Sequence, residues 1–207
     1  MHDSPPELAD CGEVAGAPKS TTSLAGAAGE HYMMAELLRR GFIAALAPQG
    51  VPNLDIIVTD PMGAQLCALQ VKTRLDRSGD GGWYMGRKHE TLIVAKLFYC
   101  FVDFGVSAEV VPKVYVIPSA KVAEVLSRVH ALWLATPGKQ GQQRQDSAIR
   151  RLIPDYGRVL SGSAEAGLYP LGWMDEYLGA WDLLRAGGAA APIDPIPPQA
   201  SRSPSGG

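Results

Sequence analysis

The residues that decide the fold are 54–74, which read LDIIVTDPMGAQLCALQVKTR. Two apolar runs, 54–59 and 65–74, flank the short connection 60–64, Asp-Pro-Met-Gly-Ala. Apolar runs of this length with β-branched residues are typical of strands, and proline with glycine in so short a connection favours a tight turn. The stretch therefore predicts a β-hairpin.

A turn symmetric about Met62 and Gly63 would place Asp55 directly opposite Gln70. Residues opposite each other in an antiparallel pair have Cβ atoms about 4.5–5.5 Å apart. Lys72 lies two positions beyond Gln70, so its side chain leaves the same face of the sheet. The pairing is a hypothesis, because a bulge or a longer loop would shift the register. It predicts an acid, an amide and an amine grouped at one end of an otherwise apolar hairpin.

This group of side chains has a chemical use. Burying a carboxylate or an ammonium without partners costs free energy, which a pair between Asp55 and Lys72 would offset and a metal ion would offset further. Oxygen ligands from Asp55 and Gln70 suit Mg²⁺, which usually keeps several waters. A bound metal would lower the pKa of a water ligand and neutralise phosphate charge. Lys72 could orient that water or stabilise the developing negative charge, so the group predicts phosphodiester hydrolysis.

Periodicity and turn signals predict further elements on both sides of the hairpin. Helices flank a run of strands, and the central strands are apolar on both faces, which predicts a sheet covered on both sides in a three-layer α/β/α arrangement. The expected elements are a helix over 23–40, strands over 42–46, 83–85, 97–104 and 113–117, a helical turn within 89–95, helices over 118–134 and 173–185, and a polar loop over 136–147.

The first helix carries a further candidate acid. An apolar stripe that begins at Glu30 continues through Met34, Leu37, Leu38 and Gly41. Glu30 is therefore expected to point along the buried face and to supply a second acid if the helix packs over this end of the sheet. Glu36 and Arg40, in contrast, form an i,i+4 pair with a routine surface role.

The stretch Glu30…Asp55…Gln70-Val71-Lys72 resembles the PD-(D/E)XK, or restriction-endonuclease-like, nuclease superfamily over roughly residues 23–118. In that superfamily a helix glutamate precedes a hairpin that carries one acid and then an acid-x-lysine motif. Asn53-Leu54-Asp55 stands where the family has Pro-Asp, and Pro52 is close by but displaced. Gln70 stands where the family usually has Glu or Asp, and this Q-x-K version is similar to some group I intron homing endonucleases and related bacterial proteins.

The resemblance implies a restriction-endonuclease-like core with a mixed central sheet and Mg²⁺-dependent hydrolysis of DNA, with Mn²⁺ able to replace Mg²⁺. It assigns catalytic roles to Glu30, Asp55, Gln70 and Lys72, with metal held by Asp55, Gln70 and Glu30. Cutting both strands needs two sites, so a homodimer or higher homo-oligomer is expected. Because Gln70 is neutral, weaker metal affinity is expected, and a catalytically inactive module that binds DNA or a protein stays open.

Residues 72–90, KTRLDRSGDGGWYMGRKHE, form a candidate nucleic-acid contact beside this site. The net charge of -2 excludes binding through bulk electrostatics, so a local patch is required. Basic side chains there could contact phosphates, and aromatic ones could stack on bases. The predicted nucleic-acid-binding residues are Arg74, Arg77, Trp83, Arg87 and Lys88.

Length and composition bound the rest of the chain. The 207 residues suffice for one full-sized core, which we place at 21–186, between a flexible segment at 1–20 and a disordered Pro/Gly/Ser-rich tail at 187–207. The three cysteines have no spacing suited to zinc. No apolar run has the length of a membrane span, and the acidic N-terminus is not a secretory signal. A cytoplasmic protein is therefore expected.

Each candidate residue also has a structural interpretation. Asp55 could be a strand-edge acid paired with Lys72 in a purely structural domain, and Gln70 could be a hydrogen-bonded core amide. Glu30 could be a solvated helix residue, and the basic residues could belong to an ordinary exposed loop. Isolated histidines are expected to be structural: His31, His89 and His130.

Overall fold

The computed structural model describes residues 21–63, 66–75, 81–138, 140–163 and 165–185. The expected flexible segment at 1–20 and the expected tail at 187–207 lie outside these ranges. None of the helices in the described ranges is long and apolar enough to cross a membrane.

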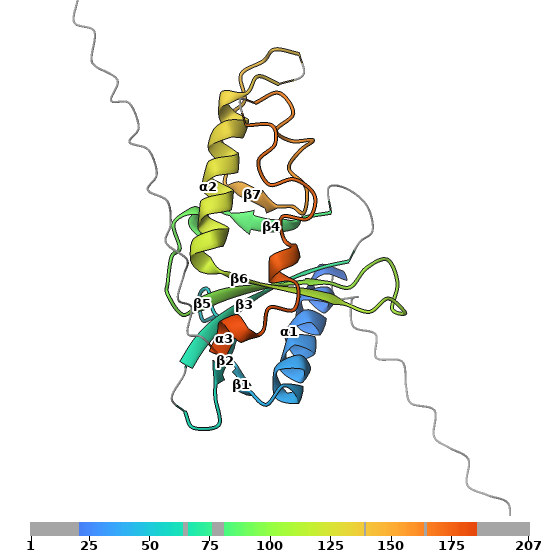
Figure 1. Ribbon diagram of the computed structural model, residues 1–207, viewed down its shortest axis with the longest axis vertical. Coiled ribbons are helices and arrows are strands. Elements are labelled where there is room, and N and C mark those ends of the chain that lie inside the picture. The colour runs from blue at the N-terminus through green and yellow to red at the C-terminus, as the bar shows by residue number, and fades with distance from the viewer. Residues whose placement is uncertain (1–20, 64–65, 76–80, 139, 164, 186–207) are drawn as a thin grey trace, which may run out of the picture.

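A five-stranded mixed sheet forms the centre of the molecule (Figure 1). Its order is β1-β2-β3-β5-β6, and all neighbouring pairs are antiparallel except β3 and β5, which are parallel. The strands are β1 Ile43–Leu46, β2 Ile56–Thr59, β3 Leu66–Arg74, β5 Leu97–Asp103 and β6 Lys113–Pro118. Because β3 is the middle strand, its side chains point alternately to the two faces of the sheet, and each face is covered by other parts of the fold.

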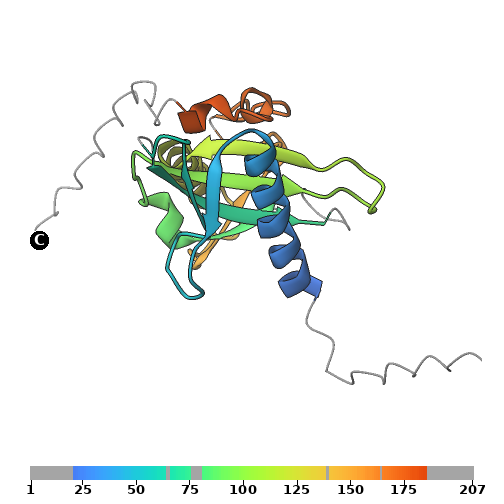
Figure 2. The same cartoon turned by 90° about the horizontal axis from the view of Figure 1, so that it is seen from below.

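Helices cover the two faces of this sheet (Figures 1 and 2). On one face, α1 (Thr21–Arg39) packs in a cluster with Leu69 and Cys100. On the other face, α2 (Ser119–Ala135) and a two-stranded sheet of β4 (Trp83–Gly86) and β7 (Ile149–Leu152) pack in a cluster with Tyr99. The expected three-layer α/β/α class with a mixed central sheet is therefore confirmed.

The buried face of α1 differs in phase from the expected stripe. Leu38, expected in the stripe, is 54% exposed, whereas Gly29, Met33 and Leu37 are buried. The reason is a close approach of backbones: a Cβ atom on Gly29 would lie 1.8 Å from Oγ1 of Thr73, at the end of β3. Contact with β3 therefore sets which side of the helix faces the core.

Glu36 occupies a different environment from the surface position expected for it. The pair with Arg40 is present at 2.5 Å, and Arg39 adds a second contact at 2.7 Å. The carboxylate is nevertheless buried, because this side of α1 packs on the sheet. Two arginines offset the cost of burying that charge.

The C-terminal segment is not the single helix expected over 173–185. It forms two short helical turns, η2 (Asp175–Tyr177) and α3 (Asp182–Arg185). Between them Gly179 has a φ of 62° and donates its N–H to the carbonyl of Val114 in β6 at 2.8 Å. Met174 and Leu184 of this segment are buried, but they do not share one helix face. Met174 packs in the cluster on the α2 side of the sheet, and Leu184 packs in the cluster on the α1 side.

Two other local predictions changed on folding. The helical turn expected within 89–95 is a 3-10 helix, η1, at Arg87–Glu90. Strand β7 had no sequence signal of its own. It forms because it pairs with β4, where Trp83 lies opposite Leu152.

Candidate active site

The hairpin that carries the site has the predicted register. Ile56 pairs with Leu69, and the pairing continues to the turn with the same offset that would set Asp55 opposite Gln70. The ladder ends at Ile56, so Asp55 lies just outside β2. Its N–H donates to the carbonyl of Leu69 at 2.9 Å. Its Oδ2 accepts the N–H of Val71 at 2.7 Å, which holds the carboxylate against β3 between the two motif residues.

Gln70 projects from the face of β3 opposite to α1, beside Tyr99 of the parallel strand β5. The residue is only 6% exposed, and its Oε1 has no hydrogen-bond partner among the described residues. A buried amide oxygen without a partner costs free energy. The expectation that Gln70 is a hydrogen-bonded core amide is therefore wrong for its Oε1. This oxygen is available to coordinate a ligand such as a metal ion.

Lys72 lies two positions along the same strand and is half-buried. Burial lowers its pKa below the ordinary lysine value, the negative charge of Asp55 raises it, and the positive charge of Lys88 lowers it. In the part of the chain that the structure describes, no salt bridge joins Lys72 to Asp55. The Lys72 amine is therefore close enough to interact electrostatically with the Asp55 carboxylate, but the two do not form a salt bridge. The purely structural interpretation predicts such a salt bridge.

Glu30 approaches the same place from α1. Its pKa is raised, first by burial and second by the negative charge of Asp55, while His31 lowers it. The tight contact of Gly29 with Thr73 fixes the helix against the end of β3 and so positions the next residue, Glu30. The charge of the Asp55 carboxylate therefore acts on the Glu30 carboxylate.

His89 and Tyr99 complete the polar surroundings and were not assigned to the site from the sequence. The Tyr99 hydroxyl and Nδ1 of His89 are 2.6 Å apart, and both side chains are buried. Burial, together with the positive charges of Lys72 and Lys88, lowers the pKa of His89 to about 4. Burial raises the pKa of the Tyr99 phenol. The phenol is therefore protonated and the imidazole neutral, the tautomer of His89 decides which of the two groups donates, and His89 adds no positive charge beside the two lysines.

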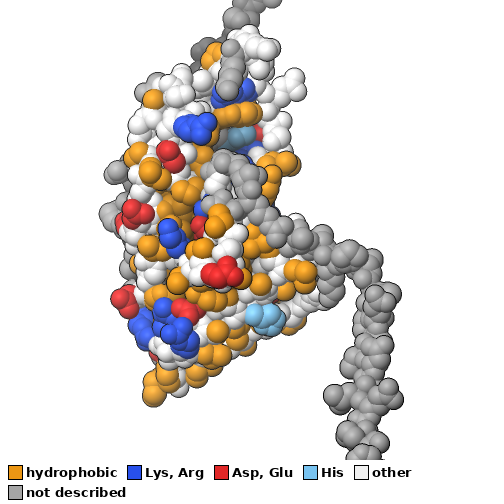
Figure 3. Space-filling view, turned by 90° about the vertical axis from the view of Figure 1, so that its right-hand side faces the viewer, with side chains coloured by type: hydrophobic (Ala, Val, Ile, Leu, Met, Phe, Trp, Pro, Cys, Tyr) orange, Lys and Arg blue, Asp and Glu red, His pale blue; other side chains and the backbone are white. Residues whose placement is uncertain are grey.

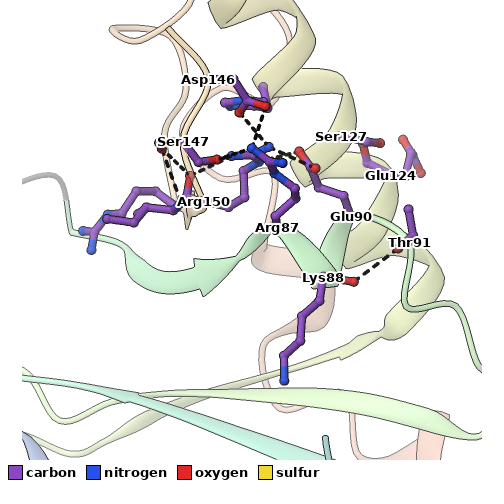
Figure 4. A network of polar contacts seen from close by, with 12 residues as sticks. Arg87, Lys88, Glu90, Thr91, Glu124, Ser127, Asp146, Ser147 and Arg150 are labelled. Atoms are coloured by element: carbon purple, nitrogen blue, oxygen red, sulfur yellow. Dashed lines mark hydrogen bonds and ion pairs between the residues drawn. The ribbon is translucent and has the colours of Figure 1, made fainter.

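An ion-pair network holds η1 in place above the central sheet (Figure 4). The Arg150 guanidinium on β7 is buried and bonds Glu90 at 2.5 and 3.1 Å and Asp146 at 3.2 Å. Lys88, in the same turn as Glu90, points away from this network toward the central sheet. The network therefore positions the Lys88 amine and the His89 ring relative to Lys72.

Two of the predicted nucleic-acid-binding residues are used within the fold instead, Trp83 as a buried residue and Arg74 as a half-buried one. Arg74 forms a salt bridge with Asp103 at 2.5 Å and lies 4.5 Å from the centre of the Trp83 ring. Trp83 is 2% exposed and donates its indole N–H to the carbonyl of Val102 at 3.1 Å. The prediction for Trp83 was wrong, because β4 folds back over β5 and turns this side chain into the core, and the Arg74 guanidinium is occupied by Asp103 and the Trp83 ring.

The other predicted contacts differ in availability. Arg87 is exposed, but its guanidinium is paired with Asp146 at 2.7 Å. Lys88 is exposed and forms no salt bridge within the described ranges. Arg77 lies outside the described residues. Figure 3 shows Lys and Arg side chains in separate small groups among acidic and hydrophobic ones, in keeping with the net charge of -2.

The oxygen donors present fit a small divalent cation. No group of three or more His, Cys, Asp or Glu side chains gathers within the described ranges, so the site offers two acids and one amide. The unpartnered Oε1 of Gln70 and the fixed carboxylate of Asp55 are hard ligands of the kind Mg²⁺ takes, and so few protein ligands suit an ion that keeps several waters. Glu30 could bind the ion or one of its waters.

Comparison with known proteins gives only distant structural similarities. No family model matches the chain, and no curated protein matches it. A bacterial homing endonuclease is 16% identical, with a TM-score of 0.44 over 83% of this chain and 96% of its own. Hjc, a Holliday junction resolvase from the archaeal hyperthermophile Archaeoglobus fulgidus, is 14% identical, with a TM-score of 0.36 over 69% of this chain and 95% of its own. Similarities this distant leave the choice of function to the side chains of this protein.

Proposed function

We propose that this protein is a metal-dependent endonuclease that hydrolyses phosphodiester bonds in DNA. The observation that supports this most directly is the Asp55 carboxylate, which accepts the N–H of Val71, the residue between Gln70 and Lys72. Among the described residues, Oε1 of Gln70 is buried without a hydrogen-bond partner, and the charge of Asp55 acts on Lys72. Such a group is costly in a purely structural core, because it leaves polar atoms without partners. Its three functional groups match the needs of phosphodiester hydrolysis.

Each side chain has a distinct role in this proposal. Asp55 and Gln70 would hold Mg²⁺, or Mn²⁺ in its place, with Glu30 as an auxiliary acid. The ion would supply a water of lowered pKa and neutralise charge on the phosphate. Lys72 orients the attacking water or stabilises negative charge that develops in the transition state. Lys88 binds a phosphate oxygen from the other side of the site, since its charge reaches Lys72.

Cleavage by matched pairs of variants tests this assignment. Asp55→Asn and Lys72→Met should each reduce Mg²⁺-dependent cleavage of plasmid and oligonucleotide DNA by about 100-fold or more, the scale for loss of one transition-state contact. The exposed residues Asp182 and Lys113 offer controls, because Asp182→Asn and Lys113→Met change the same charges away from the site. Full cleavage by Asp55→Asn, or no cleavage by the native protein with Mg²⁺ or Mn²⁺, would refute the proposal.

A homodimer or higher oligomer, acting in the cytoplasm, belongs to the same proposal. One site cuts one strand, so cleavage of both strands at one place requires two copies. Sedimentation of the protein with and without DNA measures this directly, and a monomer that makes only nicks would contradict it.

A second candidate function is a catalytically inactive module that binds DNA or a protein partner. The neutral side chain of Gln70 favours it, because the site then has one negative charge less to hold a cation. In that case the protein binds DNA in EDTA, Asp55→Ala leaves the affinity unchanged or raises it, and no divalent metal produces cleavage. Stabilisation of the fold by Mg²⁺ would argue against this second function.

A further inference from the structure

The exposed face of the β4–β7 sheet carries an aromatic side chain that the core does not use. Tyr84 is 74% exposed and lies opposite Arg151 in the strand pairing. No other large aromatic side chain among the described residues is exposed to this degree. Its neighbours along the strand, Trp83 and Met85, point to the other side and are buried. The fold therefore presents a tyrosine ring to solvent from a well-anchored strand.

Arg151 lies against one face of this ring. The guanidinium carbon is 4.0 Å from the ring centre, which is the geometry of a cation–π contact. The Nη2 of Arg151 also donates to the carbonyl of Gly82 at 3.1 Å, which ties the guanidinium to the start of β4. Since the ring stays largely exposed, its second face is open to solvent. The pair forms a rigid aromatic platform with a positive charge beneath it, which we call the Tyr84 platform (Tyr84 with Arg151).

The Tyr84 platform is linked to the candidate active site along the chain. Strand β4 leads directly into η1, which carries Lys88 and His89. Lys88 lies four positions after Tyr84, a span of at most about 13 Å for an extended chain. A stacked single strand rises about 3.4 Å per nucleotide, so about four nucleotides cover that distance. A strand whose phosphate is held at Lys88 can thus reach the platform.

We infer that the Tyr84 platform stacks an unpaired base of the nucleic-acid substrate, so that the preferred substrate contains a single-stranded segment next to the cleavage position. This inference rests on the proposed nuclease function. Bases within a duplex are already stacked on their neighbours, whereas an unpaired base can lie on an aromatic side chain and gains about 1–3 kcal/mol by doing so. The cation beneath the ring complements the charge of the nearby phosphates.

Binding measured without cleavage tests the inference separately from the enzyme activity. Fluorescence anisotropy in EDTA would compare Tyr84→Ala and Tyr84→Phe on a labelled single-stranded oligonucleotide and on the matching blunt duplex. Tyr84→Ala should weaken single-strand binding by about 5–150-fold, the equivalent of about 1–3 kcal/mol, with little effect on the duplex. Tyr84→Phe keeps the ring and should bind as the native protein does. Because Tyr84 is exposed, both variants should have the same Tm as the native protein.

The outcomes separate the two proposals. Leu171→Ala, which shortens an equally exposed side chain elsewhere, serves as the control. If Tyr84→Ala binds both oligonucleotides as tightly as the native protein, or weakens both equally, the unpaired-base inference is overturned, and cleavage by the native protein would still support the nuclease. If cleavage is absent and Tyr84→Ala still weakens only the single strand, the stacking inference survives as the property of a binding module. If the native protein neither binds nor cleaves DNA, both proposals fail.

Discussion

Replacing Gln70 by glutamate adds one negative charge at the point where the structure leaves a buried amide oxygen without a partner. In the absence of metal, the new carboxylate lies beside Asp55 at roughly the spacing of opposed residues, about 5 Å. At an effective dielectric constant of about 20, two like charges at that distance repel by about 3 kcal/mol. We therefore expect Gln70→Glu to destabilise the metal-free protein by up to about 3 kcal/mol.

Thermal unfolding measures this effect. For a domain of about 150–250 residues, a loss of about 3 kcal/mol lowers Tm by about 6–12 °C. Repulsion raises the folded-state pKa of the new carboxyl above its unfolded value, so the variant loses stability as the pH rises above about 4. The difference from the native protein should therefore be small near pH 4 and complete by about pH 8.

Mg²⁺ should reverse the loss, because under the proposed function it would bind between the two carboxylates. At a concentration 100 times its dissociation constant, a ligand that binds only the folded state stabilises it by about 2.7 kcal/mol. Gln143→Glu, at an exposed glutamine in the loop before β7, adds the same charge away from the site and serves as the control. If Gln70→Glu has the native Tm at pH 8 and gains nothing more from Mg²⁺ than Gln143→Glu does, Gln70 and Asp55 do not share a site.

Two further predictions concern the surroundings of the site. Gly29→Ala should lower the free energy of unfolding by about 1–3 kcal/mol through overpacking against Thr73. Gly26→Ala, on the same helix with nothing within 4 Å of the added Cβ, should raise it by about 0.5–1 kcal/mol. Urea unfolding compares the two, and equal shifts would contradict the close contact between α1 and β3. The folded state holds His89 neutral with a pKa lowered to about 4, so its contribution to stability is present above the ordinary value of 6.5 and is lost as the pH falls toward 4. The loss reaches about 3 kcal/mol; His89→Asn should flatten this part of the stability profile, and an equally steep decline in both proteins would count against a buried neutral imidazole.

The features that could be predicted from the sequence depend on local interactions. The turn residues Pro61 and Gly63 set the hairpin register, and the alternation along β3 then placed Gln70 and Lys72 on one face. The flanking α2 was also predictable, since its apolar spacing and its start after Pro118 lie within a single segment. Neighbouring residues carry all of this information, because strand alternation and turn geometry follow from the backbone of a few consecutive residues.

Only the tertiary structure decided which side chains are buried and by what. Trp83 and Arg74 looked available for nucleic acid, but β4 packs over β5 and pairs with β7, which lies some 66 positions later in the chain. The phase of α1 likewise followed from the close approach of Gly29 to β3. Periodicity shows that a residue can be buried, but burial itself depends on which distant segment covers it, and no short window of sequence holds that information.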